Sequence, residues 1–117
     1  MNPLLEQRLK NIPLLVVDVE TTGLIPAKDR IIELAAVLVV PGRKPRVVLD
    51  TLIDPGSAVR ATEIHGLTDE HVSGSPFVSK VGQALRPLLA NRVLVGHNFE
   101  FDLRFLFAEQ VLSLIHI

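Results

Sequence analysis

The sequence predicts an α/β fold with a mixed sheet: three antiparallel strands, a helical crossover, a fourth strand parallel to the first, and flanking helices. Three β-branched apolar segments in the first half are separated by short turns that contain proline and glycine, which favours an antiparallel meander. A segment of helical periodicity then precedes a fourth apolar run, and a helix crossing between two strands makes them parallel. A chain of 117 residues has the length of a single domain with one core.

The first strand is expected within residues 14–24, which read LLVVDVETTGL. Asp18 and Glu20 are two positions apart, so their side chains lie on the same face of that strand. We expect the strand to be largely buried, and two adjacent buried anions must be protonated, paired with cations or bound to metal. The pair is therefore either structural or a metal site.

The second and third strands are expected over residues 30–40 and 46–53, joined by the basic turn PGRKPR. Glu33 lies within the second strand. We interpret it as a structural residue that is satisfied by a hydrogen bond or a cation, rather than as a further metal ligand. The basic turn is expected to be a solvated hairpin tip.

The second half is expected to be helix, strand and helix. Apolar residues recur at helical spacing over residues 76–90, with Ser75 as the N-cap and Pro87 as a point where the helix kinks or closes. Residues 92–95 form the fourth strand. The last helix runs from about residue 99 toward residue 111. Its inward-facing residues are Phe101, Phe105 and Leu106.

Composition excludes several classes of protein. A net charge of −1 argues against a protein that holds nucleic acid mainly through a basic surface, although bound divalent ions would supply positive charge that a residue count misses. The absence of cysteine excludes disulfides and thiolate metal sites. No apolar stretch approaches the roughly 20 residues that span a bilayer. We expect no membrane partner and a cytoplasmic location.

Three segments of the chain resemble motifs of the DEDD-type, or DnaQ-like, 3′-5′ exonucleases. They are VDVETTGL at 17–24, IHGLTDEHV at 64–72 and VGHNFEFDLRFL at 95–106. They are similar to the first motif, the linking segment and the second motif, in the family's order, and most similar to those of the proofreading subunit of bacterial DNA polymerase III. The resemblance implies a ribonuclease-H-like fold and hydrolysis of phosphodiester bonds at the 3′ end of DNA. It also implies two partners, nucleic acid with a free 3′ end and a DNA polymerase subunit.

The resemblance implies a site of two divalent ions, Mg²⁺ or Mn²⁺. Asp18 would bridge both ions and Glu20 would bind one, while Asp102 would supply a third carboxylate. In isolation, Asp102 would instead be interpreted as a surface residue that complements the dipole of a helix N-terminus.

Six residues are predicted by resemblance to contact the substrate. The loop after the first strand would offer backbone N–H groups to the terminal nucleotide, and Leu24 would pack on the terminal base. Without the resemblance, these loop residues are equally well explained as the end of a strand with no contact to substrate. Asn98, together with His97, is expected to support the loop before Asp102. The predicted contacts are Thr21, Thr22, Gly23, Leu24, His65 and Asn98.

A third motif is implied by the resemblance: a late helix with a His or Tyr general base and a fourth carboxylate. After Asp102 the sequence has one acidic residue, Glu109, and one histidine, His116. We therefore expect an incomplete exonuclease domain over residues 1–111 that is nearly inactive as printed. Residues 112–117, LSLIHI, are expected to be a non-native tail, because they can be encoded by CTG TCT CTT ATA CAC ATC, which matches a transposon adapter. An ordinary apolar helix end is the alternative.

Two other functions stay open. The first is a non-catalytic interaction or nucleic-acid-binding module of the same fold, which has no evident need for three converging acids. The second is an RNA-trimming, oligoribonuclease-like enzyme, because a contact to the 2′-hydroxyl depends on a few side chains.

Overall fold

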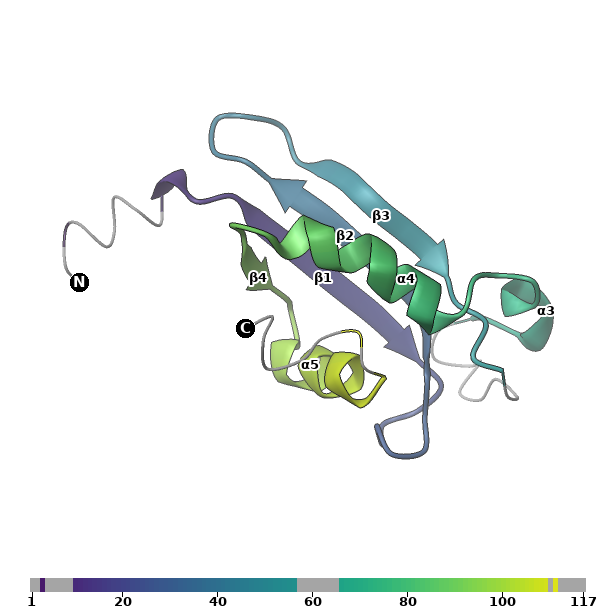
Figure 1. Cartoon of the computed structure of the whole chain (residues 1–117). Coiled ribbons are helices and arrows are strands. Elements are labelled where there is room, and N and C mark those ends of the chain that lie inside the picture. The colour runs from purple at the N-terminus through teal and green to yellow at the C-terminus, as the bar shows by residue number, and fades with distance from the viewer. Residues whose placement is uncertain (1–2, 4–9, 57–65, 110, 112–117) are drawn as a thin grey trace.

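The protein folds into a mixed four-stranded sheet with helices packed on one face (Figure 1). The computed structural model describes residue 3, residues 10–56, residues 66–109 and residue 111. Its elements are β1 (Leu14–Thr21), β2 (Ile31–Val39), β3 (Arg46–Leu52), α3 (Asp69–Val72), α4 (Val78–Leu85), the 3₁₀ turn η1 (Arg86–Leu89), β4 (Val93–Val95) and α5 (Phe99–Ala108). This architecture confirms the predicted α/β class and the order of its elements.

The strands lie in the order β3-β2-β1-β4, so β1 is central. β1 pairs antiparallel with β2, and β2 pairs antiparallel with β3. β4 pairs parallel with β1, and this pairing ends at Val95 opposite Val16. β1 continues to Thr21. Among the described residues, the last part of β1 therefore has no strand beside it on the β4 side.

The core lies between the sheet and the two longer helices. Alternate residues of β1 are buried against the helices. Figure 1 shows α4 in front of the sheet along the direction of β1, and α5 on the β4 side of β1. Burial of these apolar side chains is the main source of stability. The described part of the core comprises Leu15, Val17, Val19, Ile31, Leu34, Ala36, Ile53, Val81, Leu85, Phe105, Leu106 and Val111.

The last helix matches its predicted inward face. Phe105 and Leu106 are buried. Phe101 is half-buried, and its ring lies 4.9 Å from that of Phe105 between centroids. This packing fixes the rotation of α5 and so determines where the polar residues of its first turn are placed.

The crossover helix begins later than predicted. Ser75 is not its N-cap; that position is Phe77. The reason is a tertiary hydrogen bond, since the backbone N–H of Asp54 donates to the Pro76 carbonyl at 3.0 Å and ties this segment to the end of β3. The effect predicted for Pro87 is confirmed, because the α-helix ends before it and the chain continues as η1.

No described helix is long and apolar enough to cross a membrane.

Candidate active site

Asp18 and Glu20 lie on the exposed face of β1. Leu15, Val17 and Val19 are buried under the helices, and the acids occupy alternate positions. The prediction that the two carboxylates are buried is therefore wrong: β1 is covered by helices on the face opposite to theirs. Their exposure leaves both side chains accessible to a cation or a substrate.

Asp102 is the buried carboxylate of the site. It lies in the first turn of α5 and is 4% exposed. The backbone N–H of Val19 donates to its carboxyl group, next to Asp18 and Glu20 in sequence. This contact is available because β4 stops at Val95 and leaves that part of the β1 edge uncovered. The predicted approach of Asp102 to Asp18 is thus present in the fold.

The surroundings of Asp102 disfavour its charged form. Burial is the largest cause, followed by the negative charge of Asp18 and, more weakly, that of Glu20. The Val19 hydrogen bond and the charge of His97 act in the opposite direction. Together these effects raise the pKa of Asp102 from 3.8 to about 6. A cation near the three acids would reduce both the repulsion and the cost of burial.

The turn between β4 and α5 fits closely against β1. A Cβ added to Gly96 would lie 3.0 Å from Cδ2 of Phe99 and 3.3 Å from the carbonyl oxygen of Val17. Glycine therefore lets this turn approach the strand that carries Asp18. Asn98 is the N-cap residue, and its carbonyl accepts the Asp102 N–H at 3.1 Å. Its exposed side chain makes no capping bond, so a substrate contact by Asn98 stays a prediction.

The residues of the site fit a divalent ion in their chemistry. Carboxylate oxygens are the ligands that Mg²⁺ and Mn²⁺ prefer, and Oδ2 of Asp102 is buried with no hydrogen-bond partner. Among the described residues, no group of three or more His, Cys, Asp or Glu side chains is placed so that it could hold a metal ion. Mg²⁺ is commonly bound through one or two carboxylates together with waters and substrate phosphates.

The loop after β1 is held by its own polar groups. The Thr21 hydroxyl donates to the Gly23 carbonyl at 2.6 Å. The Thr22 hydroxyl donates to Oδ1 of Asp29 at 3.1 Å and accepts the Arg30 N–H at 3.0 Å. Both threonines are buried. Their side chains therefore shape the loop, and their predicted contact with substrate stays a prediction.

Leu24 projects from this loop, with 78% of its surface exposed. A side chain of that size and exposure, close in sequence to Glu20, is available to pack on a base as predicted. The predicted contact by His65 lies outside the described residues, as does the expected tail at 112–117.

Asp29 was not recognised in the sequence as a functional candidate. It is 5% exposed, and its Oδ2 accepts the backbone N–H of Ile25 at 3.0 Å. Its position in a polar loop is typical of a surface residue. The sequence carries no signal for its role, because the contact between its carboxylate and Gly23 forms only in the folded chain.

Glu109, the acid that follows Asp102, has a structural environment. Its Oε2 accepts the backbone N–H of Ile31 at 2.9 Å, and Oε1 lies 3.6 Å from Nε of Arg30. Its side chain is 6% exposed, and burial is the main reason that its pKa is raised. These contacts join the end of α5 to the start of β2.

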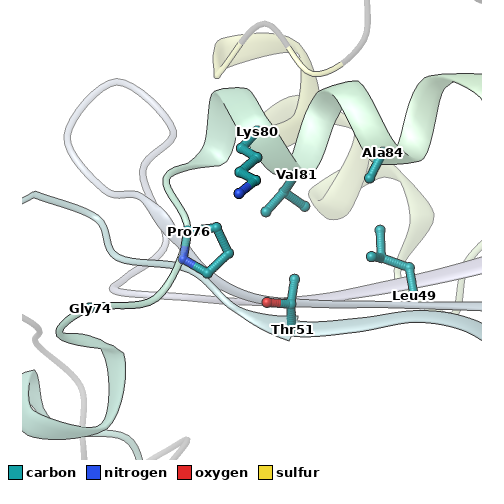
Figure 2. Close-up of a pocket in the computed structure, with 7 residues that line it drawn as sticks. All are labelled: Leu49, Thr51, Gly74, Pro76, Lys80, Val81 and Ala84. Carbon is teal, nitrogen blue, oxygen red and sulfur yellow. The ribbon is translucent and has the colours of Figure 1, made fainter.

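A pocket of about 330 Å³ opens between β3 and α4 (Figure 2). None of the predicted site residues lines it, so the pocket is separate from the carboxylates. Its lining residues are Leu49, Thr51, Gly74, Pro76, Lys80, Val81 and Ala84.

Comparison with known proteins identifies the chain's relatives. The family model described as Exonuclease matches residues 15–115. The chain belongs to this exonuclease family. Its sequence is similar to a DNA polymerase III subunit epsilon-like protein of Rhodobacter capsulatus, at 40% identity over 113 residues. It is also similar to a PolC-type DNA polymerase III of Streptococcus agalactiae, at 41% identity over 93 residues. The resemblance to DnaQ-like exonucleases is confirmed.

The matches cover unequal shares of the proteins compared. The exonuclease domain aligns over 93% of its own length with 16% of the Rhodobacter protein, and over 78% with 6% of the Streptococcus protein. Among solved structures, a zinc-bound complex of E. coli exonuclease I with single-stranded DNA is similar, with a TM-score of 0.66 and 21% identity over 81% of this chain and 22% of the other. This likeness confirms the ribonuclease-H-like exonuclease fold.

Proposed function

We propose that this domain is a metal-dependent 3′-5′ exonuclease that hydrolyses phosphodiester bonds at the 3′ end of DNA. One observation carries the proposal: Asp102 is buried beside the strand that bears Asp18 and Glu20, with Oδ2 left without a partner. A purely structural carboxylate would be expected to have both oxygens satisfied. Oδ2 of Asp102 and the exposed carboxylates of Asp18 and Glu20 would supply part of the oxygen ligands of a divalent ion.

The proposed cofactors are two divalent ions, Mg²⁺ or Mn²⁺, held by Asp18, Glu20 and Asp102. When bound, the ions would activate a water molecule and stabilise negative charge on the scissile phosphate and the leaving oxygen. Asp18 and Glu20 are exposed, so a phosphate can approach them directly. Asp102 is held in place by α5 and by the Val19 N–H, which limits its rotation toward solvent.

The substrate is proposed to bind across the end of β1. Leu24 would pack on the base of the terminal nucleotide, while the loop backbone near Gly23 would face its sugar and phosphate. An exposed apolar residue close in sequence to acidic metal ligands suits a nucleotide, which presents a base next to a charged phosphate.

The wider context is proposed from the relatives. Those named above are a polymerase III subunit epsilon-like protein and a PolC-type polymerase III, and a proofreading or repair role in the cytoplasm together with a DNA polymerase would match them. The general base and the fourth carboxylate are proposed to lie outside the residues described. Glu109 is already bound to Ile31 and Arg30. Loss of a general base typically reduces rate by about 10²- to 10⁴-fold, so weak turnover is expected from the chain as printed.

The direct test is binding of Mn²⁺ followed by hydrolysis. Mn²⁺ should raise the melting temperature of the chain, and Asp18→Asn should abolish most of that rise. A single-stranded DNA oligonucleotide labelled at its 5′ end should be shortened stepwise, slowly by this chain and faster by a version continued through a third motif. The matched control is Asp50→Asn, which removes an exposed carboxylate from β3.

Several outcomes would contradict the proposal. Equal Mn²⁺ stabilisation of the parent and Asp18→Asn would remove Asp18 from the metal site. Internal cleavage instead of stepwise shortening would exclude the exonuclease direction. Preferential shortening of an RNA of the same sequence would replace DNA with RNA as the substrate.

A further inference from the structure

Asp29 is a buried acid outside the proposed metal site. It is 5% exposed, and its two carboxylate oxygens accept hydrogen bonds from the Thr22 hydroxyl and the Ile25 N–H, at 3.1 and 3.0 Å. Its own N–H donates to the Ile25 carbonyl at 2.8 Å. Burying a carboxylate is costly unless hydrogen bonds compensate for lost hydration. These bonds supply that compensation, and they all connect parts of one loop.

The Asp29 carboxylate also lies directly against the backbone of Gly23. A Cβ built on Gly23 would lie 2.5 Å from Oδ2 and 2.7 Å from Oδ1 of Asp29. Contacts that short do not occur in stable structures, so any other residue at position 23 would displace the carboxylate. Gly23 and Asp29 therefore depend on each other: the glycine provides the space that the acid occupies.

The two ends of the loop, Thr22 and Arg30, are also joined by hydrogen bonds. The backbone N–H of Thr22 donates to the Arg30 carbonyl at 2.9 Å, and the Arg30 N–H donates to the Thr22 hydroxyl at 3.0 Å. These two bonds tie the two ends of the loop together. The loop nevertheless exposes two large apolar side chains, Leu24 at 78% and Ile25 at 49%.

We propose that Asp29 is a positioning residue that fixes Leu24 and Ile25 as a rigid apolar platform for the base of the terminal nucleotide. The inference rests on the proposed function and deepens it. Asp29 touches neither substrate nor metal in this proposal; it acts through the Ile25 N–H and through Gly23. A platform held in one conformation loses little entropy when a base packs on it. The affinity for the terminal nucleotide therefore depends on the hydrogen bonds that Asp29 makes within the loop.

The first test compares two substitutions of Asp29. Asp29→Ala removes both acceptors and should weaken binding of a single-stranded DNA oligonucleotide about tenfold, the scale of one base contact. Asp29→Asn can keep both contacts, since its oxygen can face Ile25 while its amide donates to the Thr22 hydroxyl. Asparagine should therefore restore most of the affinity. The readouts are fluorescence anisotropy with Mn²⁺ present and the emission of a fluorescent adenine analogue at the 3′ terminus, which reports unstacking of that base.

The second test is a double-mutant cycle. Gly23→Ala should weaken oligonucleotide binding in the parent, because the new methyl group displaces the Asp29 carboxylate. In an Asp29→Ala background the space is free, so the same change should have little additional effect. If Asp29→Ala does not fold, Gly23→Ala tests the same contact from the opposite side.

Mn²⁺ affinity separates this inference from the proposed function. Asp29→Ala should bind Mn²⁺ as the parent does, within about twofold, since Asp29 is not a ligand. Oligonucleotide binding and terminal-base emission equal to those of the parent would overturn the role of Asp29 alone. Loss of Mn²⁺ and oligonucleotide binding in parallel would overturn it in favour of a general structural role. A parent chain that binds neither probe would overturn the proposed function, and this inference with it.

Discussion

Replacing Asp102 with asparagine should stabilise the fold while weakening metal binding. The folded chain holds the Asp102 proton more tightly than the unfolded chain, because burial and the neighbouring acids raise its pKa from 3.8 to about 6. Asp102 therefore contributes stability below about pH 4, and that contribution is lost as the pH rises through about 6. At about 1.4 kcal/mol per pKa unit, the loss amounts to about 3 kcal/mol.

Asparagine has no proton to lose in this range, and its carbonyl oxygen can still accept the Val19 N–H. The free energy of unfolding of Asp102→Asn should therefore increase relative to that of the parent by about 3 kcal/mol between about pH 4 and about pH 8. Urea unfolding followed by circular dichroism, with metal removed by a chelator, measures this difference. Comparing two chains at each pH cancels the titration of the other acids they share.

A pH-independent difference between Asp102→Asn and the parent would refute this reasoning, because it would mean that Asp102 is not strained in its charged form. Asp50→Asn controls for the loss of one carboxylate. Adding Mn²⁺ should then remove most of the difference in stability between the variant and the parent at about pH 8. A site that binds metal at about 100 times its dissociation constant gains about 2.7 kcal/mol, and the variant forgoes most of that gain.

Two further substitutions test how α5 is attached to the sheet. Glu109→Ala leaves the N–H of Ile31 unpaired in a buried position and should lower the free energy of unfolding by about 1–3 kcal/mol. Thermal denaturation measures this loss, and Glu109→Gln should recover most of it. Unchanged stability of Glu109→Ala would contradict the prediction. Gly96→Ala places a methyl group 3.0 Å from Cδ2 of Phe99. It should lower the free energy of unfolding by about 1 kcal/mol or more and weaken Mn²⁺ binding. The control is Gly82→Ala within α4, where a methyl group meets ordinary contacts and should stabilise the helix by up to about 1 kcal/mol. Equal effects of the two glycine changes would show that the approach of the turn to β1 is not tight.

The order of elements was predictable because local patterns determine it. β-branched runs broken by proline and glycine marked the strands, and helical spacing marked α4 and α5. Phe105 and Leu106 were assigned to the core for the same reason. The position of Ser75 relative to α4 was missed, because the bond between Asp54 and Pro76 joins segments far apart in sequence.

The approach of Asp102 to Asp18 was predictable from motif and topology, whereas the burial of the acids was only partly so. Asp18 and Glu20 were expected to be buried and are exposed. A strand pattern alone does not say which face a helix covers. The role of Asp29 could not be predicted, because it depends on the contact between the Asp29 carboxylate and Gly23, which only tertiary structure reveals.

The brevity of β4 has a consequence for how such a site can change. If β4 extended two residues further along β1, its backbone would compete with the Asp102 carboxyl for the edge of β1 that Val19 offers. The position of the buried acid is thus set by where a strand stops. Insertions or deletions in the turn after Val95 should therefore alter nuclease activity more readily than side-chain changes on the outer surface of α5, even where the fold itself tolerates them.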